Sequence, residues 1–188
     1  MTPTPGFQKW FGASTVVDAN GSPLVVYHGS TSEGVPHARD KGIWFAESKS
    51  VASIYACERG AHLRTSSRDA SENVVPAYLS MQNPLVVDAN GARYDEIEID
   101  NSNWTTDELI VEAQRLGHDG LIVRNVNDLA GVTDDDLDHE PGIVFAVFTA
   151  AQIKSALGNN GSFDADNTDI RFSLADQDEQ RLEVTPCP

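Results

Sequence analysis

Basic side chains are scarce in this sequence. Its 188 residues include 13 Lys and Arg against 29 Asp and Glu, so the formal net charge is −16 and the pI is near 4.4. A nucleic-acid-binding surface needs clustered Lys and Arg to neutralise phosphates, so this charge argues against a nucleic-acid partner. Two interpretations of the acidity stay open: solubility alone, or a protein partner with a basic surface.

Cysteines and long apolar runs are also few. Cys57 lies in a helical pattern and Cys187 lies close to the last residue, so the pair predicts neither a disulfide framework nor a zinc site, and a reducing compartment is the default. No apolar run approaches the roughly 18 residues that suggest a membrane-spanning helix. The first residues lack the basic and apolar regions of a secretory signal. We therefore expect neither a membrane segment nor a signal peptide.

Motifs of several enzyme classes are missing as well. The sequence has no Gly-x-Ser-x-Gly elbow, no phosphate-binding loop and no Gly-x-Gly-x-x-Gly dinucleotide motif. The residues from Asp164 begin like a calcium loop, but Asp169 and Ala175 stand where that loop needs Gly and Glu. We therefore expect no metal site.

Short apolar runs and few helical patterns define the fold class. Alternation and apolar runs predict strands at 16–18, 24–27, 42–46, 74–80, 85–88, 120–124 and 143–148. Helical spacing predicts helices at 7–12, from about 50 to 59 and at 106–116, with a polar loop at 60–73. This composition favours an α+β fold, either as one curved sheet of mixed strand order or as two packed small mixed β-sheets flanked by helices. We place one domain at 1–174 and an acidic, disordered tail at 175–188.

The stretch 24–55 carries the pattern around which we interpret the rest. One apolar run ends in Tyr27-His28-Gly29-Ser30, a second contains Gly42-Ile43-Trp44-Phe45-Ala46-Glu47, and the following helix carries Tyr55. Aromatic faces can sandwich a flat cation, and a glycine lets its backbone approach a ligand closely. We interpret this stretch as a nucleotide pocket.

These two signatures resemble those of ADP-ribosyltransferases of the diphtheria-toxin and poly(ADP-ribose) polymerase type. The strand and turn at 145–153 resemble the third motif of the same class. Residues 7–173 as a whole resemble a narrower group, the ADP-ribosyltransferase domains of phage polyvalent proteins. The shared stretches include Phe11-Gly12-Ala13-Ser14, Gly117-His118-Asp119-Gly120 and Gln152-Ile153-Lys154-Ser155-Ala156.

The resemblance implies that NAD is the co-substrate and that no metal is needed. It places His28 against the adenosine ribose, and it places the Gly29 backbone and the Ser30 hydroxyl against the carboxamide of nicotinamide. Tyr27, the aromatic residue of the first signature, belongs to the same NAD-binding set. The reaction passes through a ribose with oxocarbenium character, so positioning of the dinucleotide is a large part of the catalysis.

The expected walls of the nicotinamide site are aromatic. Tyr55 comes from the helix, and Trp44 or Phe45 comes from the strand. Neighbouring residues of a strand point to opposite faces, so only one of Trp44 and Phe45 faces the ligand, and we favour Trp44.

The chain departs from the resemblance at one catalytic position. Many members of the class carry a Glu at the start of the third-motif strand, where it bonds the nicotinamide ribose and activates the acceptor. Counting back from Gln152 at the spacing of the class, Val144 takes that place. Glu140 lies shortly before Val144, and Pro141 and Gly142 can turn the chain back over the site. We therefore predict Glu140 as the replacement carboxylate and His28, Tyr55 and Glu140 as the catalytic set, with Val144 lining the ribose site.

The predicted function is NAD-dependent mono-ADP-ribosylation of a bacterial host protein, in the host cytoplasm and with possible delivery by a phage particle. The acidic segment 134–140 directly precedes the third-motif strand, where related transferases contact their acceptor, so we expect an acceptor with a basic surface. Val144 keeps two alternatives open: a catalytically inactive fold that binds NAD or a partner in a phage virion protein, and an NAD glycohydrolase that uses water as the acceptor.

Overall fold

The computed structural model describes residues 4–31, 42–65, 73–128 and 140–157. For residues 58–65 it describes the backbone. The predicted domain boundary at 174, the tail at 175–188 and the acidic residues at 134–139 lie outside these ranges. Within them, no helix combines the length and the apolar character that crossing a membrane requires.

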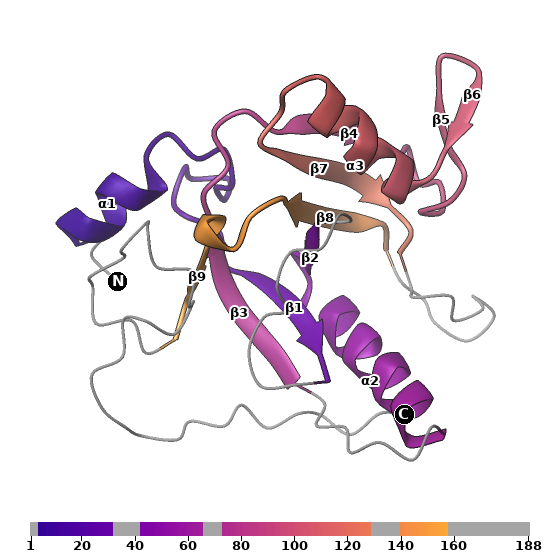
Figure 1. The fold of residues 1–188 in the computed structure, drawn as a ribbon, viewed down its shortest axis with the longest axis horizontal. Helices are drawn as coiled ribbons and strands as arrows, with labels where there is room; N and C mark the ends of the chain where they lie inside the picture. The colour runs from indigo at the N-terminus through magenta and orange to yellow at the C-terminus, as the bar shows by residue number, and fades with distance from the viewer. Residues whose placement is uncertain (1–3, 32–41, 66–72, 129–139, 158–188) are drawn as a thin grey trace.

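Within the described ranges, seven strands form one sheet of mixed direction (Figure 1). Only the β4–β7 pair is parallel, and every other neighbouring pair is antiparallel. The order across the sheet is β4 (Leu85–Asp88), β7 (Gly120–Val126), β8 (Gly142–Val147), β2 (Ile43–Ala46), β1 (Val26–Ser30), β3 (Asn73–Leu79) and β9 (Ile153–Ser155).

The sheet consists of two halves with a narrow junction. Tyr27 on β1 and Ala46 on β2 form the one registered pair between these central strands, whereas β1 pairs with β3 from Val26 to Ser30. In Figure 1 the half with β7 and β8 therefore runs in a different direction from the half with β1 and β3. The predicted α+β fold class is confirmed, and of the two sheet arrangements left open the structure has the single curved one.

In the described part of the chain, three α-helices, one short 3-10 turn and a hairpin complete the fold. They are α1 (Pro5–Phe11), α2 (Lys49–Thr65), α3 (Thr106–Arg115), the turn η2 (Ala150–Gln152) and the hairpin of β5 (Ile97–Ile99) and β6 (Ser102–Trp104). Helix α3 begins at a capping box, in which Thr105 accepts from the Glu108 N–H and the Glu108 carboxylate accepts from the Thr105 N–H. Its apolar stripe, Leu109, Ile110 and Ala113, is buried against the sheet.

The sheet separates two apolar clusters. Phe45, Val26 and Leu79 belong to the first cluster, whereas Val144 belongs to the second together with Leu109 and Ile110 of α3. Alternation along β2 places the Phe45 ring in the first cluster and packs Trp44 against the second, as the strand pattern predicts.

Several elements differ from the sequence-based prediction. Residues 60–65 continue α2, because Ala61, Leu63 and Arg64 are good helix formers and one glycine is tolerated within a helix. Residues 16–18 form only an isolated bridge, Val17 to Pro23, around a tight turn. The prediction missed the β5–β6 hairpin and β9, whose three-residue strands are too short to show a period.

Candidate functional site

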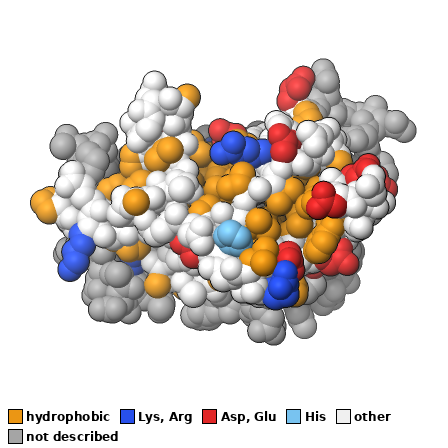
Figure 2. Space-filling view, turned by 90° about the horizontal axis from the view of Figure 1, so that it is seen from above, with side chains coloured by type: hydrophobic (Ala, Val, Ile, Leu, Met, Phe, Trp, Pro, Cys, Tyr) orange, Lys and Arg blue, Asp and Glu red, His pale blue; other side chains and the backbone are white. Residues whose placement is uncertain are grey.

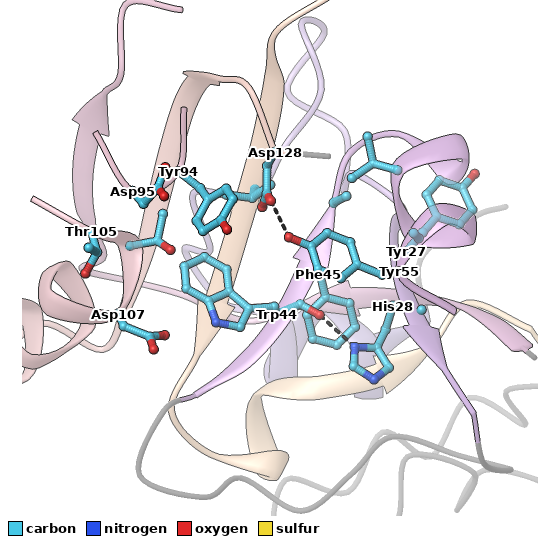
Figure 3. Close-up of a pocket in the computed structure, with 16 residues that line it drawn as sticks. Tyr27, His28, Trp44, Phe45, Tyr55, Tyr94, Asp95, Thr105, Asp107 and Asp128 are labelled. Atoms are coloured by element: carbon cyan, nitrogen blue, oxygen red, sulfur yellow. Dashed lines mark hydrogen bonds between the residues drawn. The ribbon is translucent and has the colours of Figure 1, made fainter. Parts of the chain in front are cut away.

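A cavity of about 360 Å³ opens where β1, β2 and α2 meet (Figure 3). This volume lies within the range of roughly 300–1,000 Å³ that is common for small-molecule sites. Its lining comes from β1 (Tyr27, His28, Gly29), β2 (Trp44, Phe45, Ala46), α2 (Val51, Ala52, Tyr55), the segments around α3 and β5 (Tyr94, Asp95, Thr105, Thr106, Asp107), and the segments at 128 and 144 (Asp128, Val144). Residues from both predicted signatures therefore meet at one cavity.

His28 is buried at the end of β1, with 6% of its surface exposed. Its Nδ1 lies 2.7 Å from the backbone oxygen of Trp44. A carbonyl oxygen only accepts hydrogen bonds, so Nδ1 carries a proton in this contact. The His28 ring also lies at a tilt against Phe45, with 5.4 Å between ring centroids. Bonding to β2 thus fixes the imidazole orientation at the junction of the two half-sheets.

Gly29 lines the cavity, but packing explains the need for glycine. A Cβ atom at this position would lie 2.0 Å from the Ala52 oxygen and 2.9 Å from the Ala56 nitrogen, both in the backbone of α2. No side chain fits between β1 and α2 there. The glycine of the first signature therefore lets the helix that carries Tyr55 approach the strand that carries His28.

Aromatic side chains form much of the cavity wall. Trp44 and Tyr94 are partly buried and pack against the same apolar cluster as Tyr55. In Figure 3 the Trp44 indole and the Tyr94 ring lie on one side of the view, and the Tyr55 ring lies on the other with its hydroxyl toward Asp128. The Tyr27 ring points away from this group. The arrangement offers Trp44 and Tyr55 as the walls for a flat cationic ring.

The remaining predicted residues fall into two groups. Val144 on β8 is 5% exposed, pairs with Ala46 on the neighbouring strand β2, and lines the cavity. Ser30 is buried at the end of β1 and Glu140 is exposed, and neither belongs to the lining. The cavity lining therefore contains seven of the predicted residues, and it leaves out Ser30 and Glu140. The seven are Tyr27, His28, Gly29, Trp44, Phe45, Tyr55 and Val144.

Asp128 is a site residue that sequence reasoning missed. It is 9% exposed, it lines the cavity, and its carboxylate accepts a hydrogen bond from the Tyr55 hydroxyl. A buried carboxylate requires a partner, and the Tyr55 hydroxyl is one such partner. The available signal was weak: Asp128 is a polar residue just after a buried strand that precedes the third-motif strand.

The segment before Asp128 is held firmly. The Asn127 N–H donates to the Ala92 oxygen at 2.9 Å, and the Asn127 oxygen accepts from the Tyr94 N–H at 3.2 Å. The register between β7 and β8 shifts between Val123 and Val126, which marks a bulge. Bulges redirect side chains and are common beside active sites. Asp128 thus enters the cavity from a rigid frame.

The bulge contains a left-handed residue with a specific partner. Asn125 has a φ of 50°. Its side-chain amide donates to both carboxylate oxygens of Asp88, at 2.9 and 3.0 Å. The pKa of Asp88 is lowered mainly by this hydrogen bond. The hydrogen bond from the Asn90 N–H lowers it further. Asn tolerates the left-handed region better than most residues, and the Asp88 contact holds it there.

The described lining of the cavity is rich in carboxylates. Among its described lining residues, Asp95, Asp107 and Asp128 are acidic and none is Lys or Arg. Asp95 accepts from Arg93 Nε at 2.6 Å, and this hydrogen bond lowers the pKa of Asp95. Carboxylates beside aromatic faces favour a cationic ligand group over an anionic one.

Gln152, the polar residue of the third motif, has a structural role. Its Oε1 accepts from the backbone N–H groups of Phe148 and Thr149, at 3.1 and 3.0 Å. Its Nε2 donates to the backbone oxygens of Ser80 and Asp119, at 3.2 and 2.7 Å. One side chain therefore joins the end of β8 to the ends of two other segments, which fixes the register that places Val144 in the wall.

Comparisons with known proteins match this range of the chain. The family model described as ADP-ribosyltransferase in polyvalent proteins matches residues 18–163, which include all the cavity-lining residues. No curated protein and no solved structure matches the chain.

Proposed function

This chain belongs to the family of ADP-ribosyltransferases in polyvalent proteins, and on that premise we propose that it is an NAD-dependent mono-ADP-ribosyltransferase. It cleaves the bond between nicotinamide and ribose and transfers one ADP-ribose unit to a side chain of a host protein. The acceptor presents a basic surface, and the reaction takes place in the cytoplasm of a bacterial host after delivery with a phage particle.

The observation that supports this function best is the composition of the cavity. Trp44 and Tyr55 offer aromatic faces, and Asp128 adds a negative charge beside them. The nicotinamide of NAD is a flat cation, and it fits such walls better than a phosphate or a neutral sugar does. His28, which also lines the cavity, is then the residue that meets the adenosine ribose.

The transfer step needs no reactant besides NAD and the acceptor. When the C–N bond to nicotinamide breaks, both electrons leave with nicotinamide, which departs uncharged. The ribose carbon becomes positive until a lone pair of the acceptor bonds to it, and the acceptor then loses its proton. The cavity contributes by holding the ribose and the nicotinamide in a reactive arrangement.

Labelled NAD tests this proposal directly. The purified chain is incubated with adenine-labelled NAD and a bacterial lysate, and label on a protein band is the expected result. Free ADP-ribose without a labelled band would indicate an NAD glycohydrolase. NAD binding without release of nicotinamide would indicate an inactive fold, an alternative that Val144 in the cavity wall specifically favours.

Binding is measured separately from turnover. NAD should raise the melting temperature, because a ligand that binds only the folded state stabilises it. Trp44→Ala should remove most of this shift, since it deletes one aromatic wall. The exposed Val111 on α3 lies outside the cavity, and Val111→Ala is the matched control that should keep the full shift.

A further inference from the structure

A transferase site with Val144 at the ribose position lacks a carboxylate in its third motif. Val144 is buried in the cavity wall, where its side chain offers no hydrogen bond and no charge. Positive charge that develops on the ribose is best stabilised by a fixed negative group in a site shielded from water. The question is which described carboxylate reaches the same wall.

Asp128 shares its surroundings with Val144. Both residues line the main cavity, and both also line a smaller adjoining cavity of about 200 Å³ together with Ala46 and Val51. Asp128 is 9% exposed, so its charge is screened by water far less than that of a surface carboxylate. The carboxylate therefore lies on the side of the cavity where the missing group is needed.

The Asp128 carboxylate is also held in a defined orientation. The Tyr55 hydroxyl donates to its Oδ1, and the two backbone hydrogen bonds of Asn127 fix the preceding residue. A preorganised group costs no rearrangement at the moment of reaction. By contrast, Glu140 is exposed and absent from the lining of both cavities.

We propose that Asp128 is the catalytic carboxylate of this enzyme and takes the role that the third-motif position, Val144, cannot fill. This inference rests on the proposed transferase function. As the C–N bond to nicotinamide breaks and its electrons leave with nicotinamide, the Asp128 carboxylate stabilises the positive ribose carbon. When the acceptor lone pair bonds to that carbon, the acceptor proton passes to Asp128 and from there to water.

The test compares three substitutions that each remove one carboxylate. Asp128→Asn should lower the rate of nicotinamide release at least about tenfold while the Kd for NAD changes less than about threefold, because the interaction forms mainly in the transition state. Glu140→Gln removes the carboxylate predicted from sequence. Glu98→Gln removes an exposed carboxylate of β5 outside the cavity and should leave the rate unchanged.

Asp128→Glu is the second variant, which keeps the test informative if Asp128→Asn fails to fold. It keeps the charge and an acceptor for the Tyr55 hydroxyl, so it should fold and release nicotinamide faster than Asp128→Asn. Wild-type turnover in the Asn variant would overturn the inference, as would a tenfold loss confined to Glu140→Gln or a loss of NAD affinity as large as the loss of rate. Absence of nicotinamide release by the wild-type chain would instead overturn the proposed function, and this inference with it.

Discussion

Gly29 on β1 and Ala52 on α2 are so close that a Cβ on the glycine would lie 2.0 Å from the Ala52 oxygen. This contact lies next to His28 in sequence and just before Tyr55 along the helix. The distance between strand and helix therefore sets the separation of two groups that line the cavity. A change at Gly29 acts on the site through the backbone of α2.

Gly29→Ala should destabilise the fold strongly. The added methyl group meets two backbone atoms, which cannot move aside like a flexible side chain, so α2 must shift. We expect a loss of about 3 kcal/mol or more in the free energy of unfolding, as for severe overpacking of a core. Urea unfolding measures it. Gly142→Ala is the control, since no atom lies within 4 Å of a Cβ there, and it should stay within about 0.5 kcal/mol of wild type. Equal stabilities of the two variants would contradict the steric explanation.

Local sequence patterns were enough to predict those parts of the site that lie in one stretch of sequence. The alternation of Trp44 and Phe45 and the bounds of β2 follow, to within one residue, from period and apolar runs. The bounds of β1 do not, since the strand predicted at 24–27 runs from Val26 to Ser30. The reason for Gly29 did not follow, because a close approach of two backbones is a tertiary relationship. Sequence reasoning assigned that glycine to the ligand, whereas α2 fills the space beside it.

Asp128 could not be predicted because three features distant in sequence place it. The Tyr55 hydroxyl comes from α2, the Ala92 oxygen comes from the segment before β5, and the bulge depends on Asp88 and Asn125. None of these pairings leaves a period or a motif in the sequence around Asp128. The order of strands in the sheet could not be predicted for the same reason, because β3 and β4 are successive in sequence but lie far apart in the sheet.

Tyr55 and Asp128 should behave as a coupled pair. Tyr55→Phe keeps the aromatic wall and removes only the hydroxyl that donates to the carboxylate. We expect NAD affinity to stay within about threefold of wild type and nicotinamide release to fall severalfold, because Asp128 loses its fixed orientation. Combined with Asp128→Asn, the double variant should lose less than the product of the two single effects. Independent effects would show that the hydrogen bond has no part in the reaction.

The bulge should make stability depend on pH through Asp88. The Asn125 amide lowers the pKa of Asp88 below its ordinary value of 3.8, so the unfolded chain binds a proton at a higher pH than the folded chain does. The contribution of Asp88 to stability is then complete above pH 3.8 and is lost as the pH falls below that value. Asp88→Asn should lower the melting temperature at neutral pH, and the difference from wild type should close in acid. A difference that persists in acid would assign the effect to packing.

The acidic segment before β8 should act on the acceptor protein and not on NAD. Asp134, Asp135 and Asp136 lie outside the described residues, and their role is predicted from sequence alone. Their replacement by Asn should slow protein modification more than nicotinamide release into water. The difference should shrink at high salt, because complementary charge mainly speeds encounter. Neutralising Glu96, Glu98 and Asp100 near the hairpin removes the same charge elsewhere and is the control. Similar effects of the two triple variants would indicate a role for net charge alone.

Gln152 should matter for stability and not for chemistry. Its side chain satisfies two backbone N–H groups and two backbone oxygens from three segments. Gln152→Ala leaves these four groups, three of them on partly buried residues, without that partner, and an unsatisfied buried group costs about 1–3 kcal/mol. We expect a loss of roughly 2–4 kcal/mol in the free energy of unfolding, while the NAD affinity of the folded fraction stays unchanged.

Gln152→Glu separates the donor contacts from the acceptor contacts. A carboxylate still accepts from Phe148 and Thr149 but turns a negative oxygen toward the Ser80 and Asp119 oxygens, where the amide donated. This variant should therefore be less stable than wild type at neutral pH and should recover in part when the carboxyl is protonated and can donate again. Gln114→Ala on the exposed face of α3 is the control and should leave the free energy of unfolding nearly unchanged.

The face of the molecule in Figure 2 has more acidic than basic side chains, so the Glu variant is also compared in high salt to remove the contribution of general repulsion. If Gln152→Glu matched wild type at every pH, the two donor contacts would contribute nothing to the register that places Val144 in the cavity wall.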